Sequence, residues 1–165
     1  MKNRWIALYV ENEVGVLAKV SGLFAGKSYN LHSLTVGTTE DETVSRMTIA
    51  TYGDDETFEQ IKKQLNRMVE VIKLIDFTNS SVCMKELLYV KVKKCTRQDK
   101  EELFQIAQSF DARIVDYGKD SLLLEFVHSA TKNDAIIKLM KEEFQTIEVV
   151  RGGSVGIEAI NMTQR

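Results

Sequence analysis

The chain has 165 residues, of which 44% are hydrophobic and 28% are charged, a composition typical of one ordinary folded domain or two small ones. A formal net charge of −2 argues against nucleic acid or an anionic membrane as the main partner. No apolar run approaches the roughly 18 residues that span a bilayer, and the start of the chain lacks the core of a secretory signal. With two cysteines that form no close-spaced motif, the sequence favours a cytoplasmic protein with reduced thiols.

In chain order, the first half of the sequence alternates strand-like and helix-like patterns. They lie at residues 5–10 (strand), 14–27 (helix), 31–37 and 43–51 (strands), 54–68 (helix) and 69–75 (strand). This order predicts two βαβ units that share an antiparallel hairpin, with both helices on one face of a four-stranded sheet. We expect the second strand to pair beside the first.

The same order returns after a polar stretch at residues 78–81 that suits a linker. The patterns lie at 87–92 (strand), 100–110 (helix), 112–117 and 121–127 (strands), around 135–140 (helix) and 147–151 (strand). The last strand matches residues 69–73 in residue character, position by position. We therefore predict an α+β protein of two tandem ferredoxin-like βαββαβ domains, residues 1–78 and 79–165.

Side chains suited to catalysis or metal binding are not grouped in the sequence. His32 and His128 stand outside any zinc-binding spacing, and neither cysteine has a histidine nearby to activate it. Gly152 and Gly153 lack the lysine and hydroxyl of a phosphate-binding loop, so we interpret them as a turn. The inner strands carry no aromatic pair for stacking RNA bases. We expect a chain that is not an enzyme on its own and holds no metal.

One segment has the residues of a small-ligand site, the connection at 11–17 between the first strand and the first helix. Gly15 leaves the N–H groups of the helix start open to a carboxylate, and the Asn12 amide suits an amino acid. Asn30, just before the second strand, is expected to face the same region. An apolar wall would come from Val16, Leu17, Leu31 and Val36. The segment also suits an ordinary turn in which Asn12 caps the helix, and the sequence leaves both interpretations open.

These segments resemble the ACT domain of the regulatory (small) subunits of acetohydroxyacid synthase, also called acetolactate synthase. The resemblance is carried, in order, by residues 11–17, 22–24, 29–31, 33–36, 45–49 and 59–65, and in the second half by 110, 114–116 and 150–156. Two places depart from the family pattern. Ser28 stands where a glycine is common, and His128–Ser129 stand where Thr-Gly or a near variant is common.

The resemblance implies a non-catalytic regulatory subunit of a transferase, with no cofactor in this chain. Its partner, the large catalytic subunit, would carry thiamine diphosphate, magnesium and FAD and condense pyruvate with pyruvate or 2-oxobutyrate. The small subunit would activate that partner and confer feedback inhibition by valine or another branched-chain amino acid, bound between paired ACT domains of a homodimer. The effector contacts carried over by position are Asn12, Gly15 and Asn30, with Val14, Val16, Leu17, Leu31 and Val36 around them.

Two other functions are compatible with a tandem arrangement of this fold. The first is a stand-alone amino-acid sensor with tandem ACT domains that regulates a different protein. The second is a small hydrolase of ferredoxin-like fold, which needs an arginine and an asparagine beside a phosphate loop, a combination we do not find in the sequence.

Overall fold

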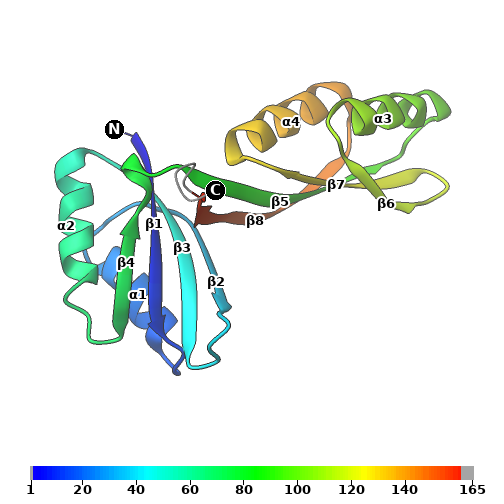
Figure 1. Ribbon diagram of the computed structural model, residues 1–165. Helices are drawn as coiled ribbons and strands as arrows, with labels where there is room; N and C mark the ends of the chain where they lie inside the picture. Colours follow the sequence, from blue (N-terminus) through cyan, green and yellow to red (C-terminus); the bar gives the residue numbers. More distant parts are fainter. Residues whose placement is uncertain (1, 161–165) are drawn as a thin grey trace. The chain divides into compact units, whose positions relative to one another are not determined.

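The structure is a computed structural model that describes residues 2–160. The described chain forms two compact units, one of residues 2–83 together with 154–160 and one of residues 84–153. Each unit contains a four-stranded sheet and two helices in the order βαββαβ, as Figure 1 shows. The prediction of two tandem ferredoxin-like domains is thereby confirmed. None of the helices within the described residues is long and apolar enough to cross a membrane.

The first unit contains a sheet with the strand order β2-β3-β1-β4. Its elements are β1 (Lys2–Glu11), α1 (Val16–Gly26), β2 (Leu31–Thr38), β3 (Val44–Gly53), α2 (Asp55–Leu65) and β4 (Val71–Asp76). The expectation that the second strand pairs beside the first is wrong, because β2 pairs with β3 at the edge of the sheet. The crossover through α1 leaves one strand position open, and β3 turns back to fill it.

The core of the first unit follows the two periodicities of its sequence. Alternate residues of β1 and residues three to four apart on α1 point to a shared interior, as their patterns predict. The buried side chains of these two elements are Ile6, Leu8, Val10, Val16, Val20 and Phe24. Because α1 and α2 bury their apolar faces against the same side of the sheet, they fix where the turns between strands and helices lie.

The second unit has the strand order β6-β7-β5-β8 and a core of its own. A short 3-10 helix, η1 (Phe77–Asn79), leads into the elements β5 (Val82–Lys93), α3 (Arg97–Ser109), β6 (Arg113–Tyr117), β7 (Ser121–His128), α4 (Ala130–Glu143) and β8 (Ile147–Glu158). The core is built from Leu88, Val90, Leu103, Leu124, Phe126, Ile136 and Met140 among others. None of its residues belongs to the core of the first unit.

The last strand is longer than the sequence pattern predicts. It continues through Gly152 and Gly153, so the interpretation of this pair as a turn is wrong. Gly152 lies close to β5, since a Cβ there would sit 3.5 Å from the carbonyl oxygen of Leu87, and Gly153 has a φ of 81° in the left-handed region. Glycines in a strand interior commonly mark such a close approach or bend.

β8 is divided at Gly153: its residues up to Gly153 belong to the second unit and those from Ser154 to the first. The Thr35 hydroxyl donates a hydrogen bond to the carbonyl oxygen of Ser154 at 3.2 Å, and the N–H of Ala159 donates to that of Ser81 at 2.8 Å. The boundary predicted from the sequence, between residues 78 and 79, places residues 154–160 in the second domain. Their contacts in the structure group them with the first unit. The return of the chain is a long-range feature that local patterns do not contain.

A buried ionic network joins three elements of the second unit and explains the arginine of the 150–156 motif. Arg151 of β8 donates two hydrogen bonds to the carboxylate of Glu86 on β5, at 3.0 and 2.7 Å. Asn133 of α4 donates to the same carboxylate at 3.1 Å. Burial raises the pKa of Glu86, but the hydrogen bonds from Arg151 and Asn133 outweigh it and hold the pKa below its ordinary value. Arg151 therefore has a structural role.

Candidate functional site

The turn between β1 and α1 leaves the start of α1 open. Gly15 occupies the N-cap position with a φ of 91°, a left-handed conformation that glycine adopts without steric cost. No side chain within the described residues caps α1, and a Cβ on Gly15 would meet nothing within 4 Å. The first N–H groups of a helix carry partial positive charge, so this end of α1 can accept a carboxylate.

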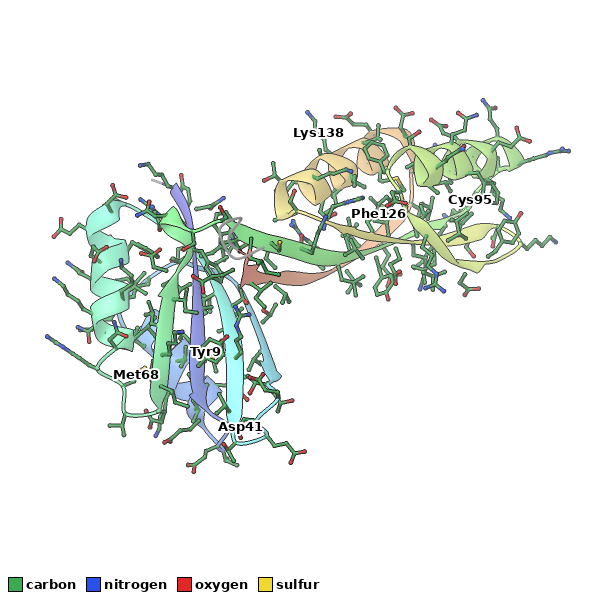
Figure 2. The ribbon with its side chains drawn as sticks, in the orientation of Figure 1. Tyr9, Asp41, Met68, Cys95, Phe126 and Lys138 are labelled. Atoms are coloured by element: carbon green, nitrogen blue, oxygen red, sulfur yellow. The ribbon has the colours of Figure 1, made fainter. Side chains whose placement is uncertain are left out.

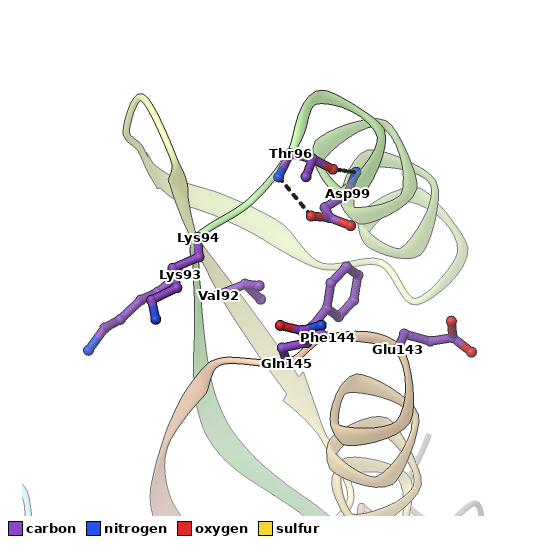
Figure 3. Close-up of a pocket in the computed structure, with 8 residues that line it drawn as sticks. All are labelled: Val92, Lys93, Lys94, Thr96, Asp99, Glu143, Phe144 and Gln145. Carbon is purple, nitrogen blue, oxygen red and sulfur yellow. Dashed lines mark hydrogen bonds between the residues drawn. The ribbon is translucent and has the colours of Figure 1, made fainter.

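The other helices of the chain contrast with α1. Side chains of Asp54, Thr96 and Ser129 accept hydrogen bonds from the first turns of α2, α3 and α4. Figure 3 shows how Thr96 and Asp99 close the start of α3, with the Thr96 hydroxyl accepting from the N–H of Asp99 and the Asp99 carboxylate accepting from that of Thr96. A hollow of about 250 Å³ lies beside this helix start, whose N–H groups are already capped by side chains. Among the four α-helices of the described residues, α1 is the one whose start has no side-chain cap.

Asn12 braces the turn rather than capping the helix. Its Nδ2 donates to the carbonyl oxygen of Glu42 at 2.8 Å, and its Oδ1 accepts from the Ser45 hydroxyl at 2.9 Å. Its backbone N–H donates to the carbonyl of Thr43 at 2.8 Å. Asn12 therefore does not cap α1 as the ordinary-turn interpretation expected. Both amide atoms are engaged within the chain, so Asn12 holds the turn at Gly15 against the start of β3.

The neighbouring apolar residues differ in how much surface they offer. Val14, within the turn, is fully exposed, and Leu17, in the first turn of α1, is nearly half exposed. Val16 points into the core and supports the turn from below, leaving little surface for a ligand. Val36 lies on the edge strand β2 with 46% of its surface exposed.

Asn30 and Leu31 lie far from this turn within one chain. The carbonyl oxygen of Asn30 accepts a hydrogen bond from the Thr51 hydroxyl at 2.7 Å, whereas Asn12 is bonded to Thr43. The eight-residue path along β3 between those two threonines spans about 26 Å, at roughly 3.3 Å per residue. The expectation that Asn30 and Asn12 of one chain face the same region is therefore wrong, and one small ligand cannot touch both.

A hollow of about 580 Å³ adjoins the turn on its strand side. Its lining residues are Glu11, Asn12, Glu13, Glu42, Thr43, Val44 and Ile72. Ile72 was not among the residues that the sequence suggested, because it is brought there by a shift in the register between β1 and β4 at Tyr9/Val10. Within the described part of the chain, no group of three or more His, Cys, Asp or Glu side chains is placed to bind a metal.

The fold and the glycine turn define the class of the first unit, a ferredoxin-like regulatory domain of the ACT type. Residues 6–73 match the family model of the AHAS small subunit-like ACT domain, and residues 85–160 match that of the small subunit of acetolactate synthase. The chain belongs to the acetolactate synthase small-subunit family.

Individual relatives match over nearly the whole chain. A probable acetolactate synthase small subunit from Archaeoglobus fulgidus is 43% identical over 152 residues, which cover 92% of this chain and 94% of the relative. The acetolactate synthase small subunit of Haemophilus influenzae is 36% identical over 154 residues, 93% of this chain and 94% of that protein. The crystal structure of the small subunit from Thermotoga maritima superimposes with a TM-score of 0.87 at 32% identity, covering 98% of this chain and 100% of that one.

Proposed function

We propose that this chain is the regulatory subunit of an acetolactate synthase, which activates the large catalytic subunit and makes it sensitive to valine or another branched-chain amino acid. The names of the relatives support a partnership with a catalytic subunit. The observation that carries the effector role is the uncapped start of α1 at Gly15, where a ligand's α-carboxylate would meet free N–H groups and the positive end of the helix dipole.

The surroundings of Gly15 suit the remaining parts of an amino acid. Glu11, Glu13 and Glu42 give the adjoining hollow a negative lining that favours an ammonium group. The exposed side chains of Val14 and Leu17 offer apolar contact for an aliphatic ligand. A zwitterion with a branched side chain therefore fits the chemistry of this end of the unit.

Asn30 would reach this site from a second copy of the chain. The edge strand β2 presents unpaired N–H and C=O groups, which favour pairing with another strand. A two-fold axis at the middle of β2 would pair it with its own copy in antiparallel fashion, with the Leu31 end of one beside the Thr38 end of the other. Asn30 of the partner subunit would then approach the end of the sheet that carries Asn12 and Gly15. A homodimer with shared effector sites would thus bring Asn30 of the partner subunit to the turn that Asn12 holds in place.

The catalytic chemistry belongs to the partner in this proposal. Thiamine diphosphate, magnesium and FAD would be held by the large subunit, and this chain would contribute binding and regulation. Reconstitution with the cognate large subunit tests the proposal, with acetolactate formation measured against valine, leucine and isoleucine. We expect the chain alone to form no acetolactate, to raise the rate of the large subunit and to confer inhibition by one of the three. A chain that changes neither the rate nor its sensitivity would contradict the proposal.

A pair of substitutions at Gly15 tests the site itself. Asp and Asn have the same size and both tolerate a left-handed φ, and the space around Gly15 admits either. Gly15→Asp places a negative charge where the ligand's carboxylate is expected, so it should raise the half-inhibitory valine concentration by about tenfold or more. Gly15→Asn should raise it less, and both variants should still activate. Isothermal titration that shows unchanged valine binding in Gly15→Asp would refute the assignment.

A further inference from the structure

Three aliphatic side chains stand exposed at one end of the first unit. Val14, in the β1–α1 turn, is fully exposed, Val69, between α2 and β4, is 89% exposed, and Ile72, near the start of β4, is 58% exposed. We call them, together with Glu11, Glu13 and Glu42, the loop-end surface. Figure 2 shows Met68 and Asp41, which mark the α2–β4 and β2–β3 connections, at this same end of the unit.

Contacts between the connections hold the loop-end surface together. The N–H of Glu11 donates to the carbonyl oxygen of Glu70 at 3.0 Å, so the end of β1 lies beside the residue that follows Val69. Lys19 of α1 forms an ion pair with the Glu70 carboxylate. Ile72, Glu11 and Glu13 line the same hollow. The three exposed aliphatic residues therefore belong to one region, although they come from distant parts of the sequence.

The exposure of Ile72 follows from the local irregularity of β4. Val71 and Leu74 of β4 pack against the core, while the register shift between β1 and β4 leaves Ile72 as the additional residue, directed away from it. Bulges of this kind often re-aim a side chain toward a functional surface. A cluster of exposed aliphatic side chains with a polar rim is typical of a protein-binding surface.

The rim identifies the chemistry of the partner. Glu11, Glu13 and Glu42 line the hollow beside Ile72, and no lysine or arginine lines it. The whole chain has 24 acidic and 22 basic residues, so this lining is more acidic than the chain as a whole. A complementary surface would present an apolar side chain surrounded by lysine or arginine residues.

We propose that the loop-end surface docks the large catalytic subunit of acetolactate synthase. The inference rests on the function proposed above and names the surface through which the two subunits would bind. Burial of Val69 and Ile72 would supply affinity, while the glutamates would orient the partner and speed its approach. Because this surface adjoins the turn at Gly15, a ligand bound at the turn would act directly on the docked subunit.

A double variant of the full-length chain tests the docking site. Val69→Lys with Ile72→Lys removes both apolar contacts and adds positive charge opposite a basic partner. We expect it to weaken binding to the cognate large subunit by about tenfold or more, measured as the dissociation constant in an activation titration. Val150→Lys, at a valine that is 55% exposed in the second unit, is the matched control and should change binding less than about twofold. Valine binding by titration calorimetry should persist in Val150→Lys, but it is no control for the double variant, because Ile72 lines the hollow proposed to take the ligand's ammonium group.

Two further measurements keep the test decisive. Val69→Ser with Ile72→Ser removes the apolar contacts without new charge and should weaken binding by a smaller factor, which guards against misfolding of the lysine variant. Glu13→Gln with Glu42→Gln should slow association and reduce its dependence on salt.

Three outcomes would overturn the inference. If the lysine variant binds the large subunit as tightly as the wild-type chain does, and the wild-type chain still activates, the docking site is refuted and the proposed function is not. A wild-type chain that does not bind the large subunit removes both. If sedimentation shows that the double variant changes from dimer to monomer, the loop-end surface is a contact between copies of this chain instead.

Discussion

Ser28 occupies a backbone position that suits glycine. Its φ is 55°, in the left-handed region, at the turn that carries the chain from α1 toward β2. For a residue with a Cβ, this conformation costs about 1–2 kcal/mol. The resemblance to the family places Ser28 where a glycine is common, and the dihedral angle gives a physical reason for glycine there.

Replacing Ser28 should therefore stabilise the first unit. We expect Ser28→Gly to raise the free energy of unfolding by about 1 kcal/mol, since relief of the left-handed strain exceeds the added entropy of the unfolded chain. Urea denaturation followed by circular dichroism measures the change. Lys27→Gly is the control, because Lys27 has a φ of −106° and gains nothing from glycine. A loss of stability in Ser28→Gly would contradict the account.

Individual residues of the candidate site differed in how well sequence reasoning could place them. Gly15 was identified from its own position between a predicted strand and a predicted helix. In the structure, the helix start beside it has no side-chain cap. Asn12 has a different local role than expected, because its partners Glu42 and Ser45 are 30 and 33 positions away. Ile72 depends on a register shift between two strands, for which the sequence carries no local signal.

At the scale of elements, hydrophobic periodicity predicts which segments form helices and strands, but it does not predict which strands pair with one another. The alternation along β1 and the helical spacing along α1 identify their buried faces correctly, because each pattern is a property of one segment. Strand order is a property of the whole sheet, so the position of β2 at the edge, away from β1, could not be obtained from its own residues. The separation of Asn12 from Asn30 follows from that order.

The edge strand β2 provides a test of self-association. Val36 on β2 and Val115 on β6 are both 46% exposed on edge strands, one in each sheet. If β2 pairs with its copy, Val36→Lys brings two like charges close to the two-fold axis and should shift the protein from dimer toward monomer. Val115→Lys should leave the dimer intact. Sedimentation velocity over a range of concentrations measures the equilibrium.

An unchanged dimer in Val36→Lys would show that the edge of the first sheet is not the contact between copies. The route by which Asn30 of a partner subunit reaches Gly15 would then be lost. In that case the effector contact carried over to Asn30 would have to be withdrawn, while Gly15 would still be tested by its own pair of variants.

For the whole molecule, the main feature is that one chain builds two separate cores. Leu8 on β1 and Leu88 on β5 are both completely buried, one in each core. Replacing a buried leucine by alanine typically costs about 2–5 kcal/mol. Because the cores share no residue, Leu8→Ala and Leu88→Ala should each lower a different thermal transition in calorimetry.

These two variants allow the effector to be assigned to one unit without a structure of the complex. A ligand that binds only the native first unit stabilises that unit, by about 2.7 kcal/mol at a ligand concentration one hundred times its dissociation constant. We expect valine to raise the transition temperature of the first unit, which is the transition lowered by Leu8→Ala. The transition of the second unit, lowered by Leu88→Ala, should keep its temperature. The second unit should not respond, because its corresponding helix start is closed by Thr96 and Asp99. If valine instead raises the transition that Leu88→Ala lowers, the ligand binds the second unit and the site at Gly15 is wrong.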